Sequence, residues 1–205
     1  MARIVLIRTC AVASVGAALL ALAALVGFVT IVGSDKIADA ARDWTFYIPA
    51  TFALCSSVLL TIGLAGLYLH QEARLGAFGA AGFVLALAGT ILAAGGQWTY
   101  VFVVPHFAAV TPELVNESTG SVLAGFVLSY AVLALGWILF GLATLRAAVF
   151  PRWTALLIVA GAAIAFLPLP SRTLVLAIGV GLLGVRLLRG TATTVEPIGD
   201  PAVAR

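Results

Sequence analysis

The run CAVASVGAALLALAALVGFVTIVG, residues 10–33, decides the fold class of this chain. It has 24 residues without a single charge and follows two cations, Arg3 and Arg8. About 20 apolar residues are enough for a helix to cross the hydrocarbon core of a bilayer, because each residue adds about 1.5 Å. The apolar part of a cleaved signal peptide has only about 7–15 residues. The run is therefore expected to be a retained first membrane span.

The composition of the whole chain indicates the same environment. Of the 205 residues, 63% are hydrophobic and only 9% are charged, and the mean hydropathy is +1.19. A soluble domain has about 25% charged residues, so this chain could not cover a water-facing surface. Its charges stand singly between apolar stretches rather than in a basic patch, which argues against nucleic-acid binding.

Five further apolar segments are long enough, or nearly so, to cross a bilayer as helices. The sequence therefore predicts an all-α fold, a polytopic transmembrane helical bundle of about six spans that forms one domain over residues 1–189. Residues 190–205 are rich in Thr, Pro, Gly and Ala and are expected to be a disordered cytoplasmic tail. Arg172 separates the last two segments, and two complete crossings are favoured over a shallow hairpin because they return this cation to water. The expected spans are residues 10–33, 48–69, 75–96, 121–145, 150–167 and 173–188.

The distribution of basic residues predicts that both termini face the cytoplasm. Positively charged residues accumulate in the cytoplasmic connections of membrane proteins. With the amino terminus inside, eight of the eleven basic residues fall on the cytoplasmic side and three on the other. The eight are Arg3, Arg8, Arg74, Arg146, Arg152, Arg186, Arg189 and Arg205, and the three are Lys36, Arg42 and Arg172.

Both long outer connections carry start signals for short surface helices. Gly33 precedes residues 35–43, in which three aspartates recur every four residues and would share one face of a helix. We interpret this face as solvated rather than as a cation site. Thr111 and Pro112 are typical of an N-cap followed by a proline at the first helical position, with Gly120 as the stop.

The stretch QWTYVFVVPHF, residues 97–107, is the most distinctive part of the sequence. It is expected to leave the third span and enter the outer loop. One interpretation is a pocket open to the outside, in which aromatic rings hold an acyl or prenyl chain and polar groups hold its head. The other is an aromatic belt that anchors the loop at the membrane surface. The candidate ligand-binding residues are Gln97, Trp98, Tyr100, His106, Glu113 and Asn116.

The expected spans have no Asp, Glu, Lys or His near the membrane centre, where proton pumps, ion-coupled transporters and voltage sensors place ionisable groups. Haem ligation by two histidines is also disfavoured, because His70 and His106 are expected about 30 Å apart, at opposite faces of the bilayer. Cys10 and Cys55 lie at different expected depths, which argues against a disulfide. No cofactor and no metal are expected.

Glycines are dense in several expected spans, where small residues let helix backbones approach closely. We expect them to mark helix contacts within the chain, with contacts between copies as the alternative. These glycines are Gly76, Gly79, Gly82, Gly136, Gly141, Gly179, Gly181 and Gly184.

Several short motifs fall between the second and fifth expected spans. They are Arg74-Leu75-Gly76, Trp98 followed by Pro105, Gly136-Trp137-Ile138-Leu139-Phe140-Gly141, Arg146, and Pro151-Arg152-Trp153. Together they resemble a group of uncharacterised multi-pass integral membrane proteins common in high-GC bacteria such as actinobacteria. The resemblance implies a multi-pass protein of the bacterial cytoplasmic (inner) membrane, and it implies no assigned activity and no active residues.

Three functions remain open at this point. The leading hypothesis is a non-enzymatic integral membrane protein that binds a lipid or another lipophilic small molecule at the outer aromatic loop. The second is an accessory subunit that packs against another membrane protein. The third is a membrane enzyme that modifies a lipid or isoprenoid, with His106 and Glu113 as acid and base. The expected partners are the lipid bilayer and either a lipophilic small molecule or another membrane protein.

Overall fold

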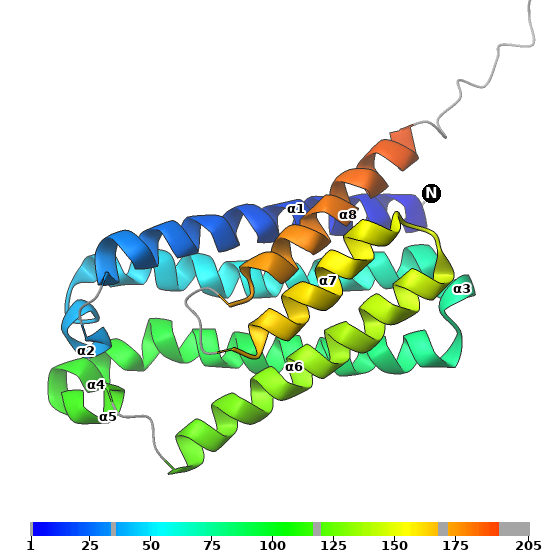
Figure 1. Cartoon of the computed structure of the whole chain (residues 1–205). Helices are drawn as coiled ribbons and strands as arrows, with labels where there is room; N and C mark the ends of the chain where they lie inside the picture. Colours follow the sequence, from blue (N-terminus) through cyan, green and yellow to red (C-terminus); the bar gives the residue numbers. More distant parts are fainter. Residues whose placement is uncertain (1, 34–35, 117–119, 168–171, 193–205) are drawn as a thin grey trace, which may run out of the picture.

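The computed structural model describes residues 2–33, 36–116, 120–167 and 172–192 (Figure 1). Within these ranges the chain is almost entirely helical and contains no β-strand, which confirms the predicted all-α class. The elements are α1 (Ala2–Gly27), the π-helix η1 (Phe28–Val32), α2 (Ile37–Ala40), the 3₁₀ helix η2 (Trp44–Phe46), α3 (Tyr47–Phe102), α4 (Val104–Val110), α5 (Pro112–Asn116), α6 (Gly120–Ala147), α7 (Arg152–Ala165) and α8 (Leu174–Ala192).

Helix α3 is a hairpin rather than one rod. Its direction reverses at Gly76, which has φ 59° and ψ −167°, a conformation that glycine adopts without the steric penalty of a Cβ atom. The rings of Tyr68 and Phe83 stack with centroids 4.2 Å apart, so the residues before and after the reversal lie side by side. We call residues 47–75 the first limb and residues 77–102 the second limb. The connection between the expected spans 48–69 and 75–96 is therefore helical, and the reversal comes after it.

The long helices form a closed ring of six segments. Helix α1 packs against the first limb and α8, α8 packs against α7, α7 against α6, and α6 against the second limb. The amino terminus, the bend within α3 and the connection from α6 to α7 lie at one end of this ring, and α2, α4 and α5 lie at the other (Figure 1). We call α2, η2, α4 and α5 the cap, and the end where they lie the cap end.

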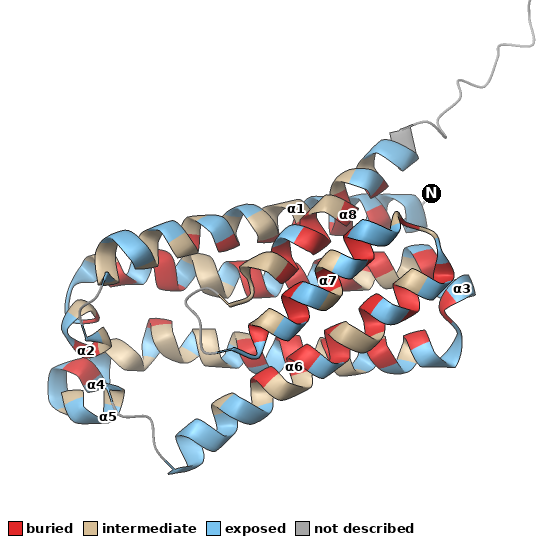
Figure 2. Ribbon diagram, in the orientation of Figure 1, coloured by how far each residue is buried: buried red, intermediate tan, exposed pale blue. Residues whose placement is uncertain are grey.

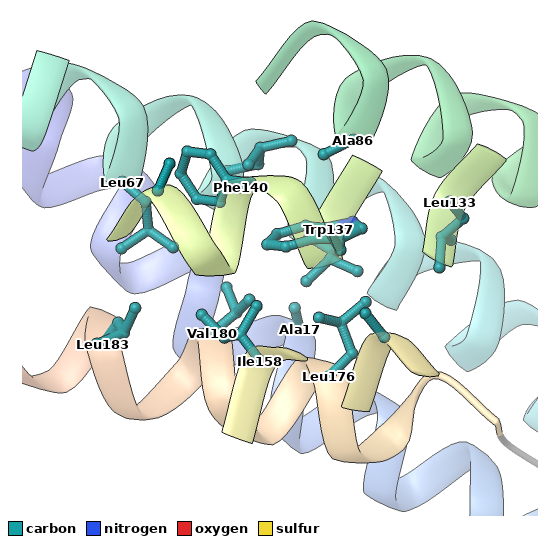
Figure 3. Close-up of a cluster of buried hydrophobic side chains, with 14 of the residues drawn as sticks. Ala17, Leu67, Ala86, Leu133, Trp137, Phe140, Ile158, Leu176, Val180 and Leu183 are labelled. Atoms are coloured by element: carbon teal, nitrogen blue, oxygen red, sulfur yellow. The ribbon is translucent and has the colours of Figure 1, made fainter. Parts of the chain in front are cut away.

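The interior of the ring is filled by large side chains from facing helices. Trp137 is fully buried, and its Nε1 donates a hydrogen bond to Thr90 Oγ1 on the second limb at 2.9 Å. Figure 3 shows Trp137 and Phe140 of α6 facing Leu176 and Val180 of α8. This core holds the second half of α6 against the neighbouring helices.

Glycines allow the closest approaches between helices in the ring. A Cβ atom at Gly82 or Gly136 would run into the backbone of the partner helix at the contact between the second limb and α6. On α1, a Cβ atom at Gly184 would run into the Ala11 carbonyl oxygen, and one at Gly181 would run into the Ala18 Cβ atom. The prediction that the glycines mark contacts within the chain is thus confirmed for these four, whereas Gly76 serves the turn and Gly79 lies against Leu75 beside it.

Three helical stretches are long and apolar enough to cross a membrane, namely Ala2–Val32, Trp44–Phe102 and Pro112–Ala147. The second of these contains both limbs of α3, while α7 is apolar but has only 14 residues. Large apolar side chains such as Leu19, Val84 and Leu135 are more than half exposed on the outside of the ring. Helix α8 ends at Ala192, so the first three residues of the expected tail, 190–192, are helical. The rest of the tail, residues 193–205, lies outside the described residues.

Candidate ligand-binding site

The cap has a small apolar core of its own. Phe46 and Ala108 are fully buried there, and the Phe46 ring stacks on Tyr100 with centroids 6.5 Å apart. Arg42 Nε donates a hydrogen bond to the Ala108 carbonyl at 3.0 Å, which links η2 and α2 to α4. Asn116 Oδ1 accepts one from the backbone N–H of α2 at 3.2 Å, which links α5 to α2. The cap is therefore one connected unit over the end of the ring.

The ring widens below the cap because its helices differ in length. At about 1.5 Å per residue, the 14 residues of α7 extend about 21 Å, whereas the 26 residues of α1 extend about 39 Å. Helix α7 ends and α8 begins short of the cap, and the start of α6 diverges from the other long helices there (Figures 1 and 2). Residues 120–125 are accordingly exposed on every face of α6, while Tyr130 and much of the helix beyond it are buried.

A cavity of ≈ 680 Å³ occupies this space, and we call it the main cavity. Its volume is that of a site for one drug-sized molecule, about 300–1,000 Å³. Its walls come from α1, η1, the cap, both limbs of α3, α6 and the residues on either side of the α7–α8 connection. Most of the lining is apolar, and six aromatic side chains contribute to it: Phe28, Phe46, Tyr100, Phe126, Tyr130 and Phe166.

One polar group of the main cavity is built around Tyr130. The guanidinium carbon of Arg172 lies 3.9 Å from the centroid of the Tyr130 ring, a cation–π contact. The side-chain amide of Gln97 donates to the Tyr130 hydroxyl at 3.5 Å. Ser56 also lines the main cavity, but its hydroxyl already donates to the Ala17 carbonyl at 2.8 Å. Arg172 is the only charged residue among the lining residues that the structure describes.

A second cavity of ≈ 530 Å³ lies on the other side of the start of α6, between the second limb, α4 and α5. Tyr100, Phe126 and Tyr130 line both cavities, so these side chains stand between the two spaces. A Cβ atom at Gly95 or Gly125 would meet no atom within 4 Å, so the backbones of the second limb and α6 leave open space here.

The structure brings together two of the six residues expected to bind a ligand. Gln97 and Tyr100 both line the main cavity. Trp98 is half exposed and lies with its ring 5.2 Å from that of Phe102, and it is not part of either lining.

The other three expected site residues lie in the cap. His106 and Glu113 are exposed and line neither cavity, whereas Asn116 holds α5 to α2 through its side-chain oxygen. Residues 97–107 were expected to leave the third span at residue 96 and enter the outer loop, but α3 continues to Phe102 and α4 starts at Val104. Pro105 does not prevent this helix, because the N–H groups of a first turn have no helical acceptor.

The aspartate row in the first outer connection does not form one helical face. Helix α2 is only Ile37–Ala40, shorter than the expected segment 35–43, and Asp35 lies outside the described residues. Asp39 lies 3.7 Å from Arg42, and the Asp43 carboxylate accepts hydrogen bonds from the Thr45 backbone N–H at 2.8 Å and hydroxyl at 2.9 Å. These bonds hold the pKa of Asp43 below its usual value.

Metal binding and a disulfide find no support in the described residues. No group of three His, Cys, Asp or Glu side chains within them could hold a metal ion, and Cys10 and Cys55 are both free. In the second outer connection α5 starts at Pro112 as expected, but Gly120 begins α6 instead of ending the preceding helix. Thr111 does not cap α5 through its side chain, since its hydroxyl is buried without a hydrogen-bond partner.

Sequence reasoning missed the two residues at the centre of the polar group, Tyr130 and Arg172. The available signal was that Arg172 is a lone cation between the two shortest apolar segments. Comparison with models of protein families, with curated proteins and with solved structures gives no match to this chain. The geometry of the main cavity therefore carries the functional argument.

Proposed function

We propose that this chain is an integral protein of the bacterial cytoplasmic membrane, with six spans and both termini in the cytoplasm, that binds one amphiphilic molecule in the main cavity at its outer end. The observation that carries the proposal is a cavity of ≈ 680 Å³ with six aromatic rings in its walls and one polar group beside them. The proposed spans are α1 with η1, the two limbs of α3, α6, α7 and α8.

The charges along the ring support this orientation. At the end opposite the cap, Arg146 lies over the ring of Phe78 at 4.7 Å and Arg186 over the ring of Trp153 at 5.6 Å. Arginine and aromatic side chains paired in this way are typical of the boundary between lipid and cytoplasm. The cap, which has fewer basic residues, then faces outward.

The chemistry of the walls supports an amphiphile as the ligand. Aromatic and aliphatic side chains around most of the main cavity suit an acyl or prenyl chain, because burial of apolar surface is favourable there. The amide of Gln97, the hydroxyl of Tyr130 and the guanidinium of Arg172 offer a hydrogen-bonding head position in one part of the same cavity.

The two alternatives have less support from the geometry. An accessory subunit was inferred from glycine-lined helices, but Gly82, Gly136, Gly181 and Gly184 are occupied by contacts inside the chain. An enzyme with His106 and Glu113 as acid and base would need a substrate site between them, and neither side chain lines the main cavity or the second cavity.

Native mass spectrometry of the full-length protein, extracted with a mild non-ionic detergent, tests the proposal. We expect a retained adduct of lipid-like mass on the wild-type chain. Ala53 lines the main cavity from the first limb, so Ala53→Trp is expected to fill the space and remove the adduct. Ala88 is exposed on the outside of the second limb, and Ala88→Trp is the matched control that should keep it. A wild type without an adduct, or equal retention by both variants, would contradict the proposal.

A further inference from the structure

We infer that the molecule held in the main cavity carries an anionic headgroup, a phosphate or a carboxylate, and that Arg172 binds this group. The inference rests on the proposed function and adds the chemical class of the ligand. It begins from a charge for which the described residues provide no counter-ion.

No acidic side chain lines the main cavity in the part of the chain that the structure describes. The two ion pairs between described residues are Arg3 with Glu72 and Arg42 with Asp39, and Arg172 belongs to neither. Arg172 is half-buried in this largely apolar wall, where a cation is costly unless it pairs with an anion or reaches water. An anionic ligand would supply the counter-charge that the described residues do not.

The contacts of Arg172 leave it able to bind such a ligand. Its guanidinium lies against the face of the Tyr130 ring, and this cation–π contact holds the group in place without using its N–H donors. A planar guanidinium with several N–H groups matches two oxygens of a phosphate or carboxylate at once. The Tyr130 hydroxyl and the Gln97 amide lie in the same wall as additional neutral partners.

The positive charge of Arg172 also argues against a cationic headgroup. A site lined by aromatic rings is typical of proteins that bind quaternary ammonium groups, and six such rings line the main cavity. Here a permanent positive charge shares the space with those rings, so a cationic head would be repelled. The combination favours aromatic contact with the chain of the ligand and ionic contact with its head.

Titrations of the purified full-length protein with three probes of equal chain length test the inference. The probes are dodecyl phosphate, dodecanol and dodecyltrimethylammonium, followed by native mass spectrometry. A hydrogen-bonded charge pair of this kind predicts that dodecyl phosphate binds about tenfold to a hundredfold more tightly than dodecanol, with dodecyltrimethylammonium the weakest. Inorganic phosphate is a fourth probe, and it should not displace dodecyl phosphate at equal concentration because it lacks the chain.

Variants of two of the three outer cations assign the effect to one residue. Arg172→Gln is expected to reduce the preference for dodecyl phosphate over dodecanol to less than threefold, and Arg172→Lys to keep part of it. Lys36 is exposed and lines neither cavity, so Lys36→Gln removes the same charge from the outer face and should change nothing. If Arg172→Gln does not fold, the relative affinities of the wild type for the three dodecyl probes still test whether the headgroup is anionic.

The results separate the inference from the proposed function. Equal binding of dodecyl phosphate and dodecanol to the wild type, or an unchanged preference in a folded Arg172→Gln, would overturn the anionic headgroup and leave the amphiphile site standing. Failure of all three dodecyl probes to bind would overturn both. Displacement of dodecyl phosphate by an equal concentration of inorganic phosphate would overturn the amphiphile and support only an anion site.

Discussion

The contact between the second limb and α6 at Gly82 yields the sharpest prediction for stability. A Cβ atom at Gly82 would lie 2.8 Å from the backbone nitrogen of Phe140 and 3.0 Å from the carbonyl carbon of Leu139. Non-bonded heavy atoms prefer about 3.5–4.0 Å, so the helices would have to separate by about 0.7 Å or more. Overpacking of this kind destabilises by about 1–3 kcal/mol, and backbone cannot move aside as a flexible side chain does. Gly82→Ala is therefore expected to lower the free energy of unfolding.

Gly95 provides a matched control on the same limb. A Cβ atom there meets no atom within 4 Å, so Gly95→Ala gains the same helix propensity, about 1 kcal/mol, without a clash. Relative to Gly95→Ala, we expect Gly82→Ala to be less stable by about 1–3 kcal/mol, or about 2–12 °C in apparent Tm for a chain of this size.

Labelling of a buried thiol provides the assay for this pair of variants. Cys10 is buried in α1 and Cys55 is exposed, so in a Cys55→Ser background a maleimide dye reacts only when the ring opens. Heating the detergent-solubilised variants with the dye gives the apparent Tm of each. If Gly82→Ala proves as stable as Gly95→Ala, the close packing of α6 on the second limb is wrong.

Three further predictions concern the core and the cap. Thr90→Val removes the acceptor of the Trp137 indole N–H, whereas Thr90→Ser keeps a hydroxyl there. In the same thiol assay, we expect the free energy of unfolding of Thr90→Val to be lower than that of Thr90→Ser by about 1–2 kcal/mol. Equal stability of the two variants would show that the hydrogen bond contributes nothing. The pKa of the Asp43 carboxyl is lowered chiefly by the Thr45 N–H, so this carboxylate stabilises the cap fully above the pKa of an unfolded aspartate. The difference in stability between wild type and Asp43→Ala should therefore disappear as the pH falls through the lowered pKa. A difference that does not depend on pH would refute this. Asn116→Ala frees α5 from α2, so hydrogen exchange should speed up at the α2 amides and stay unchanged in α6, while unchanged α2 exchange would argue against a connected cap.

The helices of the ring were predictable because apolar length alone identifies them. All six expected segments are helical in the described residues, and α6 and α8 start within a residue of the expected positions. The reversal in α3 was placed too early, because Gly76, Gly79 and Gly82 look alike in the sequence. Only the folded chain decides which glycine takes a positive φ and which ones pack against a helix. The number of membrane crossings and the resemblance to bacterial multi-pass proteins stay predictions.

Only half of the site was predictable, because its residues come from segments that are far apart in the sequence. Gln97 and Tyr100 were expected because they stand in one aromatic stretch, and both reach the main cavity. Tyr130 and Arg172 belong to segments that meet this stretch only when α6, α7 and α8 complete the ring. The sequence shows that segments 150–167 and 173–188 are the two shortest, but it does not show that α7 ends and α8 begins short of the cap, which leaves room for the cavity.

The position of a bound amphiphile is the most direct test of the account. Dodecyl phosphate with a photoreactive diazirine in its chain would be added to membranes that contain the protein, and the cross-linked peptides mapped by mass spectrometry. We predict saturable labelling at Tyr100, Phe126 and Val127, which line the main cavity, and its loss when unlabelled dodecyl phosphate is in excess. Labelling found only at outward-facing residues such as Leu19 and Ala88, and unaffected by the competitor, would mean that the probe lies in bulk lipid and that the cavity is not a binding site.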